Sequence, residues 1–285
     1  MKDYFLKVML IETHAHIDDK QFDADRDEVI KRAFDGGVEK IINIGAGLGS
    51  SQRSVALAEK CENIFCSIGL HPHYFMEYGE KSFKRIPEFK ALASSKKLVA
   101  IGEIGLDYFI PDGSLITDAQ KELQKKGFTL QLEFAKELKL PVILHCRGSR
   151  PEAPSAYREA DDAYEDVFAI VSEFPELNFV WHSFGGRLIF VEKVLEKENM
   201  LISFAGNITY NKPGAEIFAV IKKIPLERIM LETDCPYLAP VPMRGGRNEP
   251  LYVKYVAQKI AEVKNVDFED LAKVTTSTAE RFFGL

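Results

Sequence analysis

The stretch Pro141-Val142-Ile143-Leu144-His145 is a short and nearly continuous apolar run that ends in a histidine. Runs without alternating polar residues are typical of strands in a parallel sheet that is covered by helices. Similar β-rich runs recur along the chain, and together they predict eight strands. We expect these strands at residues 8–13, 40–45, 64–69, 98–103, 141–145, 178–182, 200–205 and 228–233.

Segments with helical spacing of apolar residues separate these runs. Helices are predicted at residues 25–36, 51–61, 120–138, 163–174, 188–197, 214–223 and 250–264. Eight alternating strand and helix units predict an α/β fold of the (β/α)8 TIM-barrel type. No low-complexity linker interrupts the series, so we expect residues 1–285 to form a single TIM-barrel domain.

A doubly wound open sheet is the alternative fold. Its signature is a glycine-rich phosphate-binding turn after the first strand, followed by an acidic residue further along the chain. The segment Gly45-Ala46-Gly47-Leu48-Gly49 resembles such a turn only weakly, and the acidic residue is not apparent. The barrel is therefore the favoured prediction.

Composition narrows the classes of partner. The chain has 285 residues, 46% of them hydrophobic, and a formal net charge of −6. This balance argues against a long polybasic surface that wraps duplex DNA. It does not exclude a small phosphate-ester substrate, because bound metal cations supply positive charge locally.

The four cysteines form no C-x-x-C pair, which favours reduced thiols and a cytoplasmic protein. Cys146 and Cys235 lie beside polar strand-end residues and are alternative nucleophiles, although buried thiols are the favoured interpretation. The first eight residues do not resemble a signal peptide, and no window approaches ~18 uninterrupted apolar residues. We expect no membrane association.

Polar residues with metal-binding side chains stand at or just beyond the ends of the predicted strands. Because the strand carboxyl ends of a barrel meet at one mouth, these side chains are expected to converge there. The set contains all six histidines and two acidic residues: His14, His16, His71, His73, Glu103, His145, His182 and Asp234. Imidazoles and carboxylates at such positions favour a divalent metal site over scattered core or surface histidines.

The strand order predicts two ions that share one carboxylate. His14 and His16 point to the same side of the first strand. Barrel closure brings Asp234 beside them. We expect one ion at His14, His16, Glu103 and Asp234, and a second at Glu103, His145 and His182. The cations are Mg, Mn or Zn, and the ligand types do not choose among them. Glu103 and Asp234 are the predicted catalytic residues, with Asp234 accepting a proton from the attacking water.

Several stretches together resemble the TatD family of metal-dependent deoxyribonucleases, within the amidohydrolase-like barrels. They follow the family's order and cover almost the whole chain. The matching residues are 12–18, 69–73, 102–108, 124–135, 141–147, 182–186, 203–209, 231–240 and 247–250.

The resemblance implies metal ligands at the same six positions that strand geometry selects. It also implies that His71 faces the substrate phosphate and that Asp234 is the catalytic carboxylate. The activity it implies is hydrolysis of phosphodiester bonds in DNA, often as a 3′-to-5′ exonuclease. Some relatives instead remove D-amino acids from tRNA.

The sequence departs from the family at a few places. Glu12 stands where Asp is usual, and Thr278 where Asn is common. The segment 147–162 is longer than in the family, and we expect a long loop at the barrel mouth that reshapes the cleft. Arg147 and Arg247 lie on predicted mouth loops and are candidate phosphate contacts, with solvated or structural roles as the alternative.

The leading functional prediction is a metal-dependent hydrolase that acts on DNA single strands or ends. A deep barrel mouth admits a terminal nucleotide more readily than the middle of a duplex. A hydrolase of esters or amides, such as a D-aminoacyl-tRNA deacylase that binds tRNA, is the second reading. A non-catalytic barrel is the third. Related amidohydrolases often bridge their metals with a carboxylated lysine, whereas the fourth strand here ends in Glu103. This difference favours phosphoryl transfer. The oligomeric state is not indicated.

Overall fold

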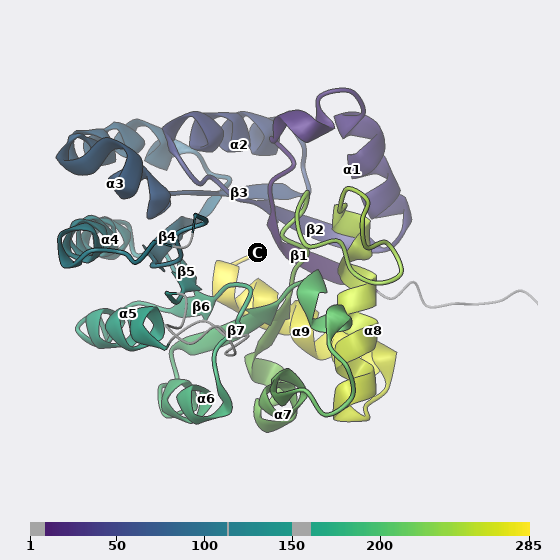
Figure 1. Cartoon of the computed structure of the whole chain (residues 1–285). Coiled ribbons are helices and arrows are strands. Elements are labelled where there is room, and N and C mark those ends of the chain that lie inside the picture. The colour runs from purple at the N-terminus through teal and green to yellow at the C-terminus, as the bar shows by residue number, and fades with distance from the viewer. Residues whose placement is uncertain (1–8, 113, 150–160) are drawn as a thin grey trace, which may run out of the picture.

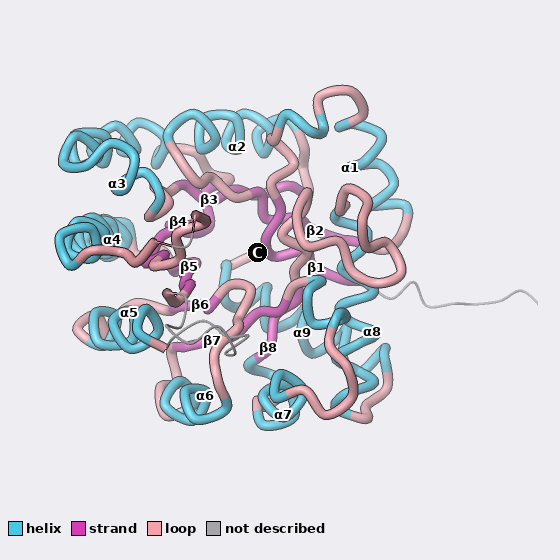
Figure 2. Tube along the Cα trace, viewed as in Figure 1, coloured by secondary structure: helices cyan, strands magenta, loops and turns pink. Residues whose placement is uncertain are grey.

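The computed structural model describes residues 9–112, 114–149 and 161–285. Eight parallel strands form one sheet in the order β1-β2-β3-β4-β5-β6-β7-β8. A bridge between Ala15 and Cys235 joins the last strand region to the first. Viewed along its axis, the sheet is a ring and the helices surround it (Figures 1 and 2). The predicted (β/α)8 barrel is confirmed, and the steadily rising strand order excludes the doubly wound sheet.

Strands and helices alternate along the chain, and helix α3 adds to the helices that the sequence predicts. The strands are β1 (Leu10–Ala15), β2 (Val38–Asn43), β3 (Ile64–Ile68), β4 (Leu98–Asp107), β5 (Val142–Arg147), β6 (Phe179–Trp181), β7 (Met200–Phe204) and β8 (Ile229–Leu231). The α-helices are α1 (Arg26–Asp35), α2 (Leu48–Lys60), α3 (His73–Tyr78), α4 (Asp118–Leu138), α5 (Asp162–Ser172), α6 (Leu188–Leu195), α7 (Glu216–Lys223), α8 (Val253–Lys264) and α9 (Phe268–Phe283).

Side chains alternate between the inside of the barrel and the helix layer. On β5, Val142 and Leu144 belong to the large core against the helices, whereas Ile143 belongs to a separate interior cluster. On β6, Val180 belongs to the same interior cluster. His145 lies two residues after Ile143, and His182 lies two residues after Val180. The period of two therefore turns both imidazoles toward the barrel axis.

Helix α9 closes the amino-terminal end of the barrel. Its Ala279 and Phe283 join the interior cluster formed by the strands. Thr276 Oγ1 donates to Met9 O, just before β1, and Thr278 Oγ1 donates to Glu227 O, just before β8. The sequence analysis did not predict α9. With this end covered by a helix, the carboxyl ends of the strands are the face on which a site can open.

Strand β4 is longer than predicted and runs four residues past Glu103. Two glycines with positive φ lie in this strand, Gly102 at 156° just before Glu103 and Gly105 at 146° within the extension. A Cβ at Gly105 would lie 2.0 Å from His145 O, so only glycine fits this close approach to β5. The extension pairs with β5 as far as Asp107 and Arg147. It therefore adds Asp107 to the polar residues at the mouth.

The predicted loop at 147–162 falls mostly on residues 150–160, which lie outside the described part of the chain. Trp181 is fully buried against Tyr164 and Phe190, so its place is in the core. No helix within the described residues is both long and apolar enough to cross a membrane.

Candidate metal centre

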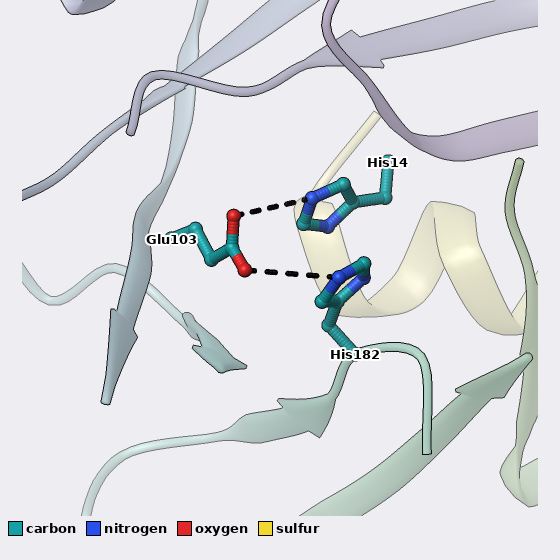
Figure 3. A group of neighbouring side chains, drawn as sticks. All are labelled: His14, Glu103 and His182. Carbon is teal, nitrogen blue, oxygen red and sulfur yellow. Dashed lines mark ion pairs between the residues drawn. The ribbon is translucent and has the colours of Figure 1, made fainter. Parts of the chain in front are cut away.

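The six predicted ligand residues converge at the carboxyl ends of the strands. His14 lies on β1 and His16 follows it, Glu103 lies on β4, His145 on β5, His182 follows β6, and Asp234 follows β8. Figure 3 shows the Glu103 carboxylate facing the imidazoles of His14 and His182. Asp234 has φ 58°, a left-handed conformation that Asp adopts more readily than most residues. Its backbone N–H donates to His14 O, which fixes the end of β8 against β1.

The first predicted ligand set is assembled around one point. His14 Nε2 lies 3.6 Å from Glu103 Oε2 and 3.9 Å from Asp234 Oδ1. His16 Nε2 lies 4.0 Å and 3.4 Å from the same two oxygens. Ligand atoms that each lie about 2.0–2.2 Å from one ion must lie within about 4.4 Å of each other. All four imidazole–carboxylate distances meet this condition, and the ligand atoms of His14, His16 and Asp234 also lie within 4.8 Å of one another, so these three residues fit one cation with Glu103 beside them.

The second predicted set shares the other oxygen of Glu103. His145 Nδ1 is hydrogen-bonded to Glu103 Oε1 at 2.5 Å, and His182 Nε2 lies 3.7 Å from that oxygen. Three groups in the described part of the chain have ligand atoms within 4.8 Å of one another: His14, His16 and Asp234; His14, Glu103 and His182; and His71, Asp107 and His145. The second set is thus divided, with His182 grouped beside His14 and His145 beside Asp107.

An unpaired imidazole nitrogen supports the presence of a cation. His14 is fully buried, and among the described residues neither of its ring nitrogens has a hydrogen-bond partner. A buried polar atom without a partner is costly. The ring stacks on His182 with centroids 3.5 Å apart, and its Nε2 faces two carboxylates. A cation between His14, Glu103 and Asp234 would satisfy that nitrogen. The donor set therefore fits a divalent metal.

Two carboxylates that the sequence analysis missed stand behind the ligand histidines. Asp107 Oδ2 lies 3.2 Å from His145 Nε2 and also 2.7 Å from His73 Nε2. Glu232 Oε1 lies 2.9 Å from His182 Nδ1. Glu232 is itself held by Ser203 Oγ and by the backbone N–H of Ser183. A carboxylate in this position orients the imidazole and makes it a stronger metal ligand.

Side chains on neighbouring elements fix the backbone of the site. On α4, Gln124 hydrogen-bonds both the N–H and the C=O of Asp107, and Gln131 does the same for Leu70, just before His71. Buried Glu12 accepts from the N–H groups of His14 and Thr233, which joins the ends of β1 and β8. Burial raises the pKa of Glu12 well above its usual range.

Attraction between imidazoles and carboxylates shifts their pKa values at the centre. Burial alone would raise the pKa of Glu103, but the charge and hydrogen bond of His145 and the nearby His14 imidazole hold it well below its usual range. Burial alone would lower the pKa of His16, but its bond to Asp234 raises it to about 9. The charge of Glu103 and the bond to Asp107 similarly raise the pKa of His145 to about 10, against the effect of burial. Glu103 is therefore ionised.

His71 reaches the metal centre in a neutral state. Burial and the charge of His145 lower its pKa to about 3. Its Nε2 lies 3.8 Å from Glu103 Oε1, and its ring centroid lies 4.3 Å from that of His145. His73 is more exposed and pairs with Asp107 at the rim. The predicted phosphate contact of His71 stays a prediction.

The two candidate arginines have different surroundings. The Arg147 guanidinium lies 3.6 Å from the centroid of the Phe109 ring, at the mouth of the barrel. The Arg247 guanidinium makes two bonds to the Asp25 carboxylate, at 2.8 and 2.7 Å, and a third to Gln21 O. This pairing holds the loop before α8 against α1. The structure places Arg247 in a structural contact, which is the alternative role, and its predicted phosphate contact stays a prediction.

Two cavities open onto the centre, with volumes of about 340 and 560 Å³. His145, Arg147, His182, Asp234 and Tyr237 line both of them. Arg247 is not among the described residues that line either cavity. The metal centre is therefore accessible to a ligand from the mouth.

Comparison with known proteins agrees with this geometry. A family model described as TatD related DNase matches residues 11–284. The chain is 38% identical over 277 residues to the uncharacterized metal-dependent hydrolase YabD of Bacillus subtilis, covering 96% of this chain and 99% of YabD. It is 34% identical over 273 residues to the 3′-5′ ssDNA/RNA exonuclease TatD of Erwinia amylovora, covering 93% and 96% of the two chains.

A solved structure shows the same architecture. The crystal structure of YjjV, a TatD homolog from Escherichia coli, matches with a TM-score of 0.82 and 27% sequence identity, covering 98% of this chain and 100% of YjjV. The family match spans β1 to the end of α9 and thus includes every residue of the metal centre. The chain belongs to the TatD family of metal-dependent hydrolases.

Proposed function

We propose that this hydrolase is a 3′-to-5′ exonuclease that removes nucleotides from the ends of single-stranded DNA, with two divalent cations at Glu103. The observation that carries the proposal is the convergence of four imidazoles and two carboxylates on one accessible point of the barrel mouth. Relatives named 3′-5′ ssDNA/RNA exonucleases support the substrate class, and RNA ends are included on that ground.

The ligand residues divide between the two cations. His14, His16 and Asp234 would hold one, His145 and His182 the other, and Glu103 would contact both. When bound, such a pair lowers the pKa of a water molecule and neutralises the charge that develops on the phosphoryl oxygens. Imidazole and carboxylate ligands suit Zn or Mn, and also Mg with additional water.

The remaining steps belong to the chain's own side chains. Burial would raise the pKa of Asp234, but its bond to His16 and the nearby imidazoles lower it, so the carboxylate is ionised and accepts the proton of the attacking water. Arg147 lies at the mouth and would orient a phosphate oxygen. Neutral His71 would contact the same phosphate without adding positive charge.

The shape of the barrel favours the end of a strand over its middle. Helix α9 covers the opposite end, so a nucleotide chain enters and leaves through the mouth. Cavities of a few hundred Å³ are the size of small-ligand sites and admit one or two nucleotides more readily than a duplex. A net charge of −6 agrees, since binding along a duplex requires many neutralised phosphates.

Reconstitution with metal tests the proposal. Metal-stripped protein is supplied separately with Mg, Mn and Zn and incubated with end-labelled single- and double-stranded oligonucleotides and with a D-aminoacyl-tRNA. A ladder that begins at the 3′ end of single strands supports the proposal. Release of the amino acid without nucleotide cleavage would favour the deacylase, and silence with every metal on every substrate would overturn both. The Glu103→Ala variant serves as the metal-binding control.

A further inference from the structure

The two cavities at the metal centre differ in the chemistry of their outer walls. Beyond the residues that they share, the larger one is lined by charged and imidazole side chains, in which the carboxylates of Asp18, Asp19, Glu103 and Asp107 stand beside Arg53, His71 and His73. The smaller one is lined by Tyr164, Ser183, Asn207 and Leu238, which carry no formal charge. A base with its sugar fits the second wall, whereas a backbone phosphate fits the first where bound cations offset its carboxylates.

One exposed aromatic ring stands where the cavities meet. Tyr237 lines both, and it is 51% exposed although it lies beside the metal ligands. Its ring centroid lies 6.2 Å from that of His16, with the two planes 67° apart. A ring at this position exposes a flat apolar face within reach of anything bound at the centre.

The backbone of Tyr237 is fixed on both sides. Its N–H donates to Asp234 O at 2.9 Å, and its C=O accepts from Asn248 Nδ2 at 2.6 Å. The buried Asn248 side chain also donates to Thr233 O, so the loop after β8 holds the tyrosine and the catalytic carboxylate as one unit. Because its backbone is ordered before binding, the ring contacts a ligand at a low entropic cost.

We propose that Tyr237 is a stacking platform for the terminal nucleobase of the substrate, which lies in the smaller cavity while the rest of the strand leaves along the larger one. This inference rests on the proposed exonuclease function and adds the position of the substrate. Stacking on an aromatic face suits an enzyme that must accept every base, since each base has a π-face. The platform lies next to Asp234, so the scissile phosphate of a stacked nucleotide is directed to the metal centre.

The test compares substrates that differ in a single base. One single-stranded oligonucleotide ends in thymidine, the second ends in an abasic tetrahydrofuran nucleotide, and the third has the abasic unit one position inward. Each is labelled at the end that the wild-type protein does not attack. Stacking of a base on an aromatic side chain corresponds to about 5- to 150-fold in affinity, so wild type should cleave the thymidine end more efficiently than the abasic end by a factor in that range.

Three variants attribute this preference to the ring. Tyr237→Leu removes the ring and should bring the ratio of kcat/KM between the two ends close to one. Tyr237→Phe keeps the ring and should keep the preference. Tyr78→Leu is the matched control, because Tyr78 is similarly exposed, at 45%, but lies outside the described lining of both cavities. Equal melting temperatures establish that the variants are folded.

The outcomes separate this inference from the proposed function. If wild type cleaves none of the oligonucleotides, the exonuclease proposal fails. If wild type cleaves them and Tyr237→Leu keeps the preference for a terminal base, the function stands and the platform is wrong. A preference that depends on Tyr237 but responds only to the inner abasic unit would overturn the placement of the terminal nucleotide.

Discussion

The two halves of the metal centre lie against the two oxygens of Glu103 and are supported in different ways. In the first half, His16 Nδ1 faces a backbone carbonyl, Ile44 O, at 3.2 Å, and within the described chain His14 Nδ1 has no hydrogen-bond partner. In the second half, each imidazole has a carboxylate behind it: Asp107 behind His145 and Glu232 behind His182.

This difference shows where each half obtains its negative charge. In the proposed centre, the first half presents Asp234 directly as a ligand, in addition to its share of Glu103. In the second half, the proposed carboxylate ligand is Glu103. Further negative charge acts on this half through its histidines. Carboxylates that hydrogen-bond a ligand imidazole increase its basicity and fix its orientation. Affinity in the second half should therefore depend on the carboxylates that hold its histidines, Asp107 and Glu232.

The largest effect is expected where the two halves join. Glu103→Ala removes the carboxylate that both halves share, so metal content should fall from two ions per chain to fewer than one. Turnover should fall by more than about 10⁴-fold, beyond the loss that follows removal of a single acid-base group. Elemental analysis after gel filtration measures the first quantity, and end-labelled oligonucleotide cleavage the second.

An exposed acidic residue provides the control for this variant. Glu137 pairs with Lys90 on the surface, and Glu137→Ala should change neither quantity. Retention of both ions by Glu103→Ala would mean that the halves are independent. That result would contradict the description of Glu103 as their common ligand.

The next largest effect concerns the first half alone. Asp234→Asn keeps an oxygen ligand but removes the charge and the proton-accepting ability, so turnover should fall by about 10²–10⁴-fold while metal is retained. The measurement pairs single-turnover cleavage with metal analysis. Loss of the metal together with activity would show that Asp234 serves chiefly as a ligand. Full activity would remove it from the mechanism.

A smaller effect should isolate the second half. Asp107→Asn and Glu232→Gln remove the carboxylates behind His145 and His182, and each should weaken the second ion by about 10–100-fold while the first binds as before. Competition with a chromophoric chelator resolves the two affinities. Asp25→Asn is the matched control, because Asp25 pairs with Arg247 away from the cavities. Equal weakening of both ions would point to general disruption of the barrel mouth.

The convergence of the candidate ligand residues could be predicted from sequence because strand periodicity decides where their side chains point. His145 follows Ile143 by two residues, and His182 follows Val180 by two, so an apolar run ending in histidine is enough to place an imidazole inside the barrel. The prediction of the six candidate ligand positions and of the strand order depended on patterns within single segments. The barrel could be predicted for the same reason, and the structure confirms it.

The supporting residues were not predictable in this way, because their roles arise from contacts between segments. Asp107 is available because two glycines let β4 continue beside β5, and Glu232 acts through a histidine two strands away. Helix α9 joins the interior cluster through Ala279 and Phe283, with Phe282 packed against it, which is a weak signal in sequence. Arg247 is a surface arginine until α1 places Asp25 against it. Each of these roles depends on a contact with a residue from another segment, and local sequence patterns do not indicate such contacts.

The smallest expected effect is on the stability of the metal-stripped protein, where imidazolium charges take the place of the cations. The pKa of His16 is about 9 and that of His145 about 10, both above the value of about 6.5 in an unfolded chain. Because these folded-state values are raised, their stabilisation is complete below pH 6.5 and is lost as the pH rises toward 9–10. His71, with a pKa of about 3, stays neutral throughout this range and contributes no slope.

The melting temperature of the metal-stripped protein should therefore fall by a few degrees between pH 7 and pH 10, given that about 1 kcal/mol corresponds to a shift of about 2–4 °C in a chain of 150–250 residues. The metal-loaded protein should show a flatter profile, because divalent charge then neutralises Glu103 and Asp234 at every pH. The two profiles are measured side by side in the same buffers, so titration elsewhere in the chain cancels. His16→Asn and His145→Asn should each reduce the slope of melting temperature against pH in the metal-stripped protein. Parallel profiles with and without metal would mean that neither imidazole carries the charge that balances these carboxylates.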